Sequence, residues 1–249
     1  MTQAMERQGA DAPVVQPTHR SGRPWPVEFF STAIGKKWVM AVTGLGLMGF
    51  VFAHMVGNLK MFLGPEEFDA YAEALKTLLY PIIPETGVLW IFRFGLIVMF
   101  GLHITSAYQL TRMNHRARPV KYQSPRDYIA ANFAARTMRW TGIIVGLYLL
   151  FHLADMTWGL LDPEFVKGAA YNNLVTSLSR PPVAAIYIAA NLALGIHLFH
   201  GGWSMFQSLG LNSPRYNNAR KAFAAGFAIV VAGMNCFFPI AVLTGIVAK

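Results

Sequence analysis

The sequence has few charged residues and a single cysteine for its length. Only 13% of its 249 residues are charged, against about a quarter in soluble domains. Hydrophobic residues make up 54%, and the mean hydropathy is +0.38. These values indicate an integral membrane protein, and the length fits one helical bundle without a large soluble domain. Because Cys236 is alone, an intrachain disulfide and a metal cluster held by four cysteines of this chain are excluded.

Acidic residues are also scarce, with 12 Asp and Glu against 21 Lys and Arg, which gives a net charge of +9. The basic residues cluster between hydrophobic runs, so membrane topology explains them better than nucleic-acid binding does, and no nucleic-acid partner is expected. Residues 1–30 form a polar segment rich in proline without the apolar core of a secretory signal. We interpret them as a cytoplasmic tail.

Residues 31–249 are predicted to form an all-α transmembrane domain. Five apolar runs each have the length of a membrane-spanning helix, at roughly 38–63, 88–111, 140–161, 183–209 and 222–247. Basic and non-basic loops alternate between them, so the positive-inside rule places the N-terminus in the cytoplasm and the C-terminus outside. We find no convincing internal repeat in the sequence.

Each of the first four spans carries a histidine deep in its apolar run, and the fifth carries none. These histidines are His54, His103, His152 and His197. An ionisable side chain in hydrocarbon is costly, so it is a functional-site candidate by default. Two imidazoles facing each other from neighbouring helices are how proteins hold a six-coordinate haem iron. For any one histidine alone, a hydrogen bond between helices is the alternative.

The helix rise converts sequence position into depth from the cytoplasmic side. His54 and His152 lie at roughly 0.6 of the span, and His103 and His197 at roughly 0.4. This predicts an outer (distal) pair, His54 with His152, and an inner (proximal) pair, His103 with His197. Two centres at different depths suit an electron path across half a membrane.

Three further residues are candidates for binding a haem propionate or a quinone. His200 follows His197 by one turn on nearly the same face, so it is also an alternative ligand. Arg93 lies inside the outer boundary and needs an anionic partner, for which a propionate or an interhelical acid qualifies. Arg139 marks the inner end of the third span, where the positive-inside pattern explains it equally well.

The quinone site is poorly determined by the sequence. An outer pocket needs a proton-handling group, and Glu66, just after the first span, is a candidate by location. An inner pocket has as candidates Trp38, Trp203 and Ser204.

Three sequence stretches carry a resemblance to a known family. They are Ile34-Gly35-Lys36-Lys37, His54-Met55-Val56-Gly57-Asn58-Leu59 and His197-Leu198-Phe199-His200-Gly201-Gly202-Trp203-Ser204. With four histidines in spans one to four, the chain from residue 34 onward resembles the five-helix cytochrome b subunit (b558 type) that anchors bacterial succinate dehydrogenase and fumarate reductase. In that family the first and third histidines bind the distal haem, and the second and fourth the proximal haem. The tryptophan six residues after His197 favours His197 over His200 as the ligand.

The resemblance implies a multi-pass subunit of the bacterial inner membrane, part of respiratory complex II in the tricarboxylic acid cycle. Its partners would be a flavoprotein subunit and an iron–sulfur subunit on the cytoplasmic face, within a complex that can form a higher oligomer. Two b haems would pass electrons to a quinone, menaquinone in such organisms. No succinate chemistry would occur on this chain itself.

Three alternatives stay open. The first is another diheme b-type transmembrane reductase. The second is an anchor with no metal centre, or one with an iron–sulfur cluster to which Cys236 and two histidines contribute. The third is a transporter or scaffold whose histidines move protons or make structural contacts.

Overall fold

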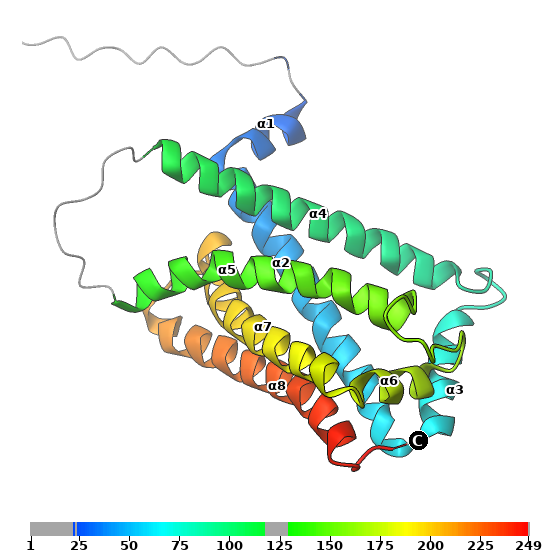
Figure 1. The fold of residues 1–249 in the computed structure, drawn as a ribbon. Helices are drawn as coiled ribbons and strands as arrows, with labels where there is room; N and C mark the ends of the chain where they lie inside the picture. The colour runs from blue at the N-terminus through cyan, green and yellow to red at the C-terminus, as the bar shows by residue number, and fades with distance from the viewer. Residues whose placement is uncertain (1–21, 23, 118–128, 249) are drawn as a thin grey trace, which may run out of the picture.

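The structure, a computed structural model, describes residue 22 and residues 24–117 and 129–248, with the backbone alone for 129–136. All regular elements in this part of the chain are helical. Five of the helices described there are long and apolar enough to cross a bilayer (Figure 1). The predicted all-α class and the five spans are therefore confirmed, and the protein is a multi-pass membrane protein. Residues 1–21 and 23 of the predicted tail lie outside the described residues.

The five spans are built from long α-helices, two of which continue into a turn of another helix type. They are α2 (Ala33–Asn58) with the 3₁₀ turn η1 (Leu59–Leu63), α4 (Gly87–Arg116), α5 (Ile129–His152) with the π turn η2 (Leu153–Thr157), α7 (Pro181–Ser208) and α8 (Asn217–Leu243). The shorter elements are α1 (Trp25–Ser31), α3 (Pro65–Lys76), α6 (Ala170–Leu178) and η3 (Pro214–Tyr216). Each predicted span overlaps one long helix, with ends that differ by a turn or so except at the third span, where α5 begins about three turns earlier, at Ile129.

The connections between the spans contain short helices. After the first span lies α3, which ends at Lys76. The segment after the third span was expected to be a loop, yet it contains α6, most of whose side chains are buried. Thr32 acts as the N-cap of α2, because its Oγ1 accepts a hydrogen bond from Gly35 N–H at 2.9 Å.

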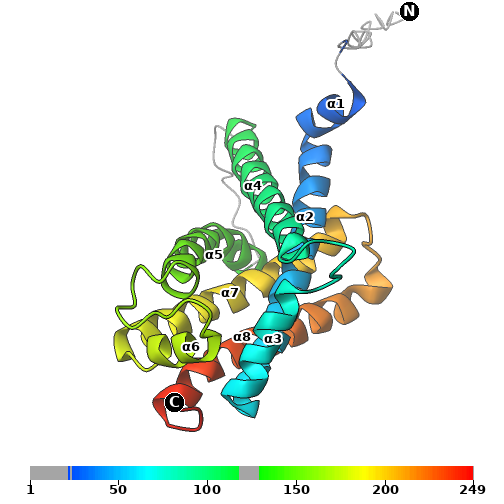
Figure 2. The same cartoon turned by 90° about the vertical axis from the view of Figure 1, so that its right-hand side faces the viewer.

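The helices form a bundle in which α7 and α8 run side by side, with α2 crossing them (Figures 1 and 2). α4 packs against α2, and α5 packs against α7. The buried core lies mainly between α2, α7 and α8, with Met48, Leu198 and Val231 among its members. Gly195 permits the close approach of α8, since a Cβ there would lie only 2.8 Å from Ala232 Cβ.

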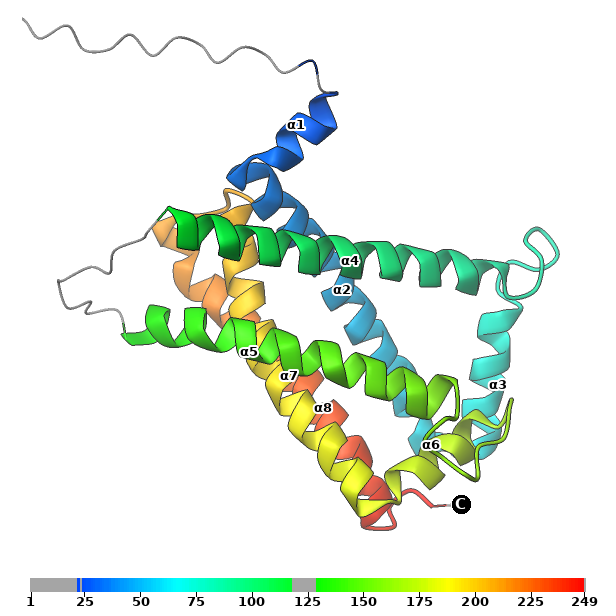
Figure 3. The same ribbon diagram turned by 45° about the horizontal axis from the view of Figure 1, so that its top comes forward.

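One end of the bundle is closed by short helices. Figure 3 shows α3, α6 and the C-terminal residues gathered there, away from the end where α4 stops and α8 starts. Tyr171 in α6 joins these parts, because its backbone N–H donates to Asp69 Oδ1 at 2.9 Å and its hydroxyl donates to Ala248 O at 2.8 Å. This cap packs beside the end of α5, where one of the four histidines lies.

Candidate functional site

The four intramembrane histidines lie in two facing pairs. The ring centroids of His54 and His152 are 5.9 Å apart, and those of His103 and His197 are 6.4 Å apart. These are the same pairs that helix depth predicts. With metal–nitrogen bonds of about 2.0–2.1 Å, two imidazoles on one metal ion would have centroids about 6.3 Å apart. Both pairs therefore have the spacing that a shared metal requires, while their role as ligands stays a prediction.

The paired histidines come from helices that face each other across the bundle. α2 with α5 supplies the outer pair, and α4 with α7 supplies the inner pair. The closely packed neighbours are different pairs, α2 with α4, α5 with α7 and α2 with α7. His103, His152 and His197 are half-buried, and His54 is exposed. The rings are thus left partly uncovered by protein atoms, as a bound planar group between the helices requires.

Each ring of the inner pair has its Nδ1 atom held by the neighbouring helix. His103 Nδ1 lies 3.1 Å from the carbonyl oxygen of Met40 and 3.3 Å from Thr43 Oγ1. Because a carbonyl only accepts, Nδ1 must carry the proton and donate it. His197 Nδ1 lies 3.3 Å from Thr141 Oγ1, and the backbone of Met138 is a further partner. The lone pair of each ring is thereby left on Nε2, the arrangement that metal-ligating histidines usually have.

These contacts expose a repeat that was missed in the sequence. α2 and α5 share the pattern Met-x-x-Thr-Gly followed by nine residues and a histidine, at Met40 to His54 and at Met138 to His152. In each helix the Met-x-x-Thr part contacts an inner histidine, and the final histidine belongs to the outer pair. The glycine is also used in both copies. A Cβ on Gly44 would lie 3.3 Å from His103 Cε1, and one on Gly142 would lie 3.4 Å from His197 Cε1.

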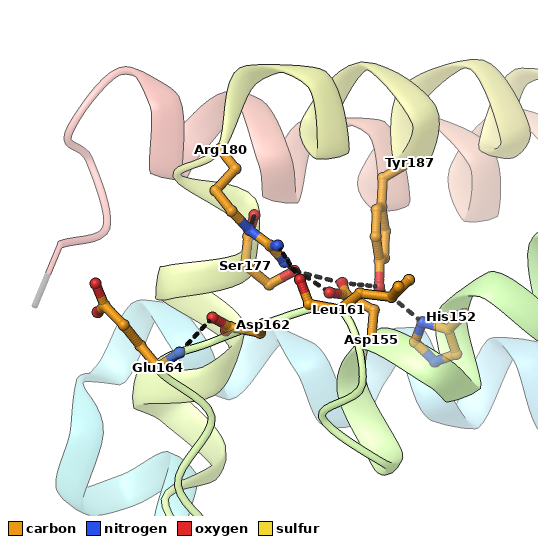
Figure 4. A network of polar contacts seen from close by, with 8 residues as sticks. All are labelled: His152, Asp155, Leu161, Asp162, Glu164, Ser177, Arg180 and Tyr187. Atoms are coloured by element: carbon orange, nitrogen blue, oxygen red, sulfur yellow. Dashed lines mark hydrogen bonds and ion pairs between the residues drawn. The ribbon is translucent and has the colours of Figure 1, made fainter.

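The outer pair has a different set of contacts. His152 Nδ1 lies 3.2 Å from the hydroxyl oxygen of Tyr187, and that hydroxyl donates to Asp155 Oδ2 at 3.0 Å (Figure 4). Directly after His152 the α5 helix widens into the π turn η2, which contains the buried Asp155. Such π turns are frequent at functional sites. His54 stacks on Phe50, with ring centroids 5.6 Å apart.

A family model matches part of the chain. The family model of the succinate dehydrogenase/fumarate reductase transmembrane subunit matches residues 132–235. With its five apolar helices, the chain fits a cytochrome b anchor subunit. The matched stretch contains His152, His197, Asp155, Arg180 and Tyr187, and it ends before the last turns of α8. Searches of curated proteins and of solved structures found no match.

The remaining propionate candidates lie in separate places. Arg93 is exposed on α4, with its guanidinium 4.9 Å from the centre of the Trp90 ring. Arg139 is exposed near the start of the third span, where its Nη1 lies 3.3 Å from His115 Nε2. His200 is buried on α7 and lies against Phe199. None of these contacts identifies one of these residues as a partner of a haem propionate or a quinone.

The quinone candidates are only partly brought together. Ser204 lines a pocket of about 310 Å³ between the start of α2 and the end of α7, and its other lining residues are Ile34, Lys37, Gln207 and Ser208. The Trp203 indole nitrogen is buried and has no hydrogen-bond partner among the described residues, while Lys221 lies over its ring. Trp38 and Glu66 are exposed and do not line this pocket.

A second pocket of about 400 Å³ lies by α6, lined by Asp162, Pro163, Glu164, Thr176, Ser179 and Arg180.

Cys236 does not join the histidines. Its Sγ lies 3.6 Å from the carbonyl oxygen of Ile188, at the contact of α8 with α7. Among the described residues, no three His, Cys, Asp or Glu side chains are grouped as a metal site. The geometry therefore gives no support to the alternative cluster built on Cys236.

Two sets of site residues escaped the sequence reasoning. Thr43 and Thr141 had a visible signal, the repeated Met-x-x-Thr-Gly pattern. Asp155 also had one, because it lies within the predicted third span, where an acid calls for explanation as much as a histidine does. Its partners Tyr187 and Arg180 had no comparable signal, since only the fold brings α6 and α7 to the end of α5.

Proposed function

We propose that this chain is the haem-carrying anchor of a bacterial succinate:quinone oxidoreductase, which passes electrons from an iron–sulfur subunit to a membrane quinone, menaquinone. The observation that carries the proposal is the two facing histidine pairs, three of whose four rings have Nδ1 engaged by protein groups. The family match supports the anchor role.

The residues fit two b haems. His54 and His152 would hold the outer haem, and His103 and His197 would hold the inner one. The haem supplies a one-electron couple when bound. The chain would supply the ligating imidazoles, holds three of the four rings by a contact at Nδ1, and would keep the centres apart along α2 and α5. Arg93, Arg139 and His200 remain candidates for the propionates or a quinone.

The exposed basic residues support a docking face for the partner subunits. They include Lys37, Arg112, Arg116, Arg215 and Lys221, which lie in the first turns of α2 and α8, the last turns of α4, and η3. Figure 3 shows these segments at the end of the bundle opposite the α3–α6 cap. By the positive-inside rule this end faces the cytoplasm. The flavoprotein and iron–sulfur subunits would bind there, close to the inner histidine pair.

The pocket at this end is the quinone site that we favour. The Ser204 hydroxyl can donate a hydrogen bond to a quinone carbonyl, and Lys37 supplies a positive charge beside it. Ser204 lies seven residues after His197 on α7, about 10 Å along the helix axis. An electron leaving the inner haem or the iron–sulfur partner would have a short way to this pocket. Glu66 and Trp38 lie outside it.

A dithionite-reduced minus oxidised visible spectrum of the purified complex, with haem measured per chain, tests the proposal. Two b-type haems per chain are expected. A complex with succinate dehydrogenase activity and no haem would contradict the ligand assignment and leave only the anchor role.

A further inference from the structure

We infer that Tyr187, Asp155 and Arg180 are positioning residues that set the reduction potential of the outer centre independently of the inner one. They act through His152, to which Tyr187 is hydrogen-bonded (Figure 4). This inference rests on the proposed ligation of haem by His152.

The direction of each hydrogen bond follows from the groups involved. The Tyr187 hydroxyl has one proton, and Asp155 Oδ2, 3.0 Å away, is an acceptor. Tyr187 Oη therefore accepts at its other side, so His152 Nδ1, at 3.2 Å, must be the donor. The series runs from imidazole to phenol to carboxylate and leaves Nε2 of His152 with its lone pair.

The carboxyl group at the end of this series is buried and forms an ion pair. The side chain of Asp155 has no exposed surface, and that of Arg180 is 30% exposed. Arg180 Nη2 contacts Asp155 Oδ1 at 2.6 Å, and Ser177 Oγ donates to Asp155 Oδ2. Arg180 is itself fixed by the carbonyl oxygens of Leu161 and Ser177. A negative charge thus lies one hydrogen bond beyond Tyr187, with the positive charge one step farther from His152.

A negative group behind a ligating histidine makes the imidazole a stronger electron donor. It stabilises the oxidised iron, which carries one more positive charge than the reduced iron, and so lowers the potential. The inner histidines have neutral partners instead, a hydroxyl at Thr141 and a carbonyl at Met40. The outer centre is therefore expected to have the lower potential of the two.

Redox titration of the assembled complex, followed by its visible spectrum, tests the inference with charge changes of opposite sign. Asp155→Asn removes the negative charge and should raise the outer potential. Arg180→Gln removes the positive charge and should lower it. Tyr187→Phe keeps the ring but breaks the connection to Asp155, so it should raise the outer potential. The inner potential should stay unchanged in all three variants, and Ser179→Ala, beside Arg180, should change neither.

A network with a merely structural role would not produce opposite shifts at one centre. The inference is overturned if Asp155→Asn and Arg180→Gln move the outer potential in the same direction or leave it unchanged. If Asp155→Asn does not assemble, Tyr187→Phe decides, since an unchanged outer potential there also overturns it. A native complex without haem would instead refute the proposed function, so the two failures are distinguishable.

Discussion

The Nδ1 atom of His103 lies 3.1 Å from the carbonyl oxygen of Met40, which belongs to the neighbouring helix α2. This contact fixes which ring nitrogen carries the proton, because a carbonyl oxygen only accepts. The ring orientation is also set, because Thr43 holds the same nitrogen from one turn farther along α2. The Thr141–His197 contact repeats the relationship on α5 and α7. The inner pair is therefore arranged in advance for ligation through Nε2.

Replacement of an outer histidine should remove one haem and spare the other. His152→Ala or His54→Ala is expected to reduce the haem content from two per chain to one, because bis-histidine ligation needs both rings. Haem quantification and the difference spectrum measure this. His115→Ala, outside the two pairs, serves as the control and should keep both haems. Loss of the inner haem alone from either outer variant would show that the pairing is wrong.

The two threonines that contact the inner histidines should each support haem binding at the inner site. Thr141→Val removes one of two acceptors for His197, and Thr43→Val removes one of two acceptors for His103. Loss of such a supporting contact typically costs about 10–100-fold in metal affinity. Haem titration of the apo complex should show weaker binding at the inner site, with the outer site unchanged. Thr244→Val, whose hydroxyl bonds within α8, is the matched control. Equal effects at both sites would argue against specific support.

A methyl group beside the inner histidines should also disturb them. In Gly142→Ala the new Cβ would lie 3.4 Å from His197 Cε1, so the ring must shift by a few tenths of an ångström. Lower occupancy of the inner haem is expected in the absorption spectrum, with the outer haem retained. Gly233→Ala on α8 is the control, because its Cβ would meet no atom within 4 Å. An unchanged inner haem would mean that the ring has room to move.

Two variants separate an inner quinone site from an outer one. Ser204→Ala should raise the KM for quinone several-fold, since the hydrogen bond lost is worth about 1 kcal/mol. Succinate oxidation with a soluble electron acceptor should stay at the native rate. Glu66→Gln, at the other end of α2 and η1, should leave quinone reduction unaffected. If Glu66→Gln impaired quinone reduction and Ser204→Ala did not, the quinone site would lie on the outer side instead.

The five long helices and the spatial pairing of the histidines could be predicted from the sequence, and the physical reasons can be named. Membrane spans are set by hydrophobic length, and helix rise turns residue number into depth, so His54 could be matched with His152 before the fold was known. Quinone candidates such as Glu66 and Trp38 were chosen by sequence position alone. Position gives depth but not facing direction, and the pocket near Ser204 leaves both outside.

The contacts beyond the histidines depended on features that sequence periodicity does not encode. Asp155 is placed by the π turn that follows His152, where the regular helical spacing fails. Arg180 and Ser177 reach it because α6 folds over the end of α5, in a segment expected to be a loop. Tyr187 lies among ordinary apolar residues of α7, and only the packing of α5 on α7 gives it a role.

The repeated pattern in α2 and α5 has a consequence for distance. Thr43 and His54 are eleven residues apart, as are Thr141 and His152, which corresponds to about 16 Å along a helix axis. Each helix thus touches both centres, and the two helices keep the same interval between them. An inserted residue in either interval would turn one outer histidine by about 100° and separate it from its partner. The distance between the two histidine pairs is therefore set by a number of residues that is the same in both helices, and under the proposed function this is the distance that an electron would cross.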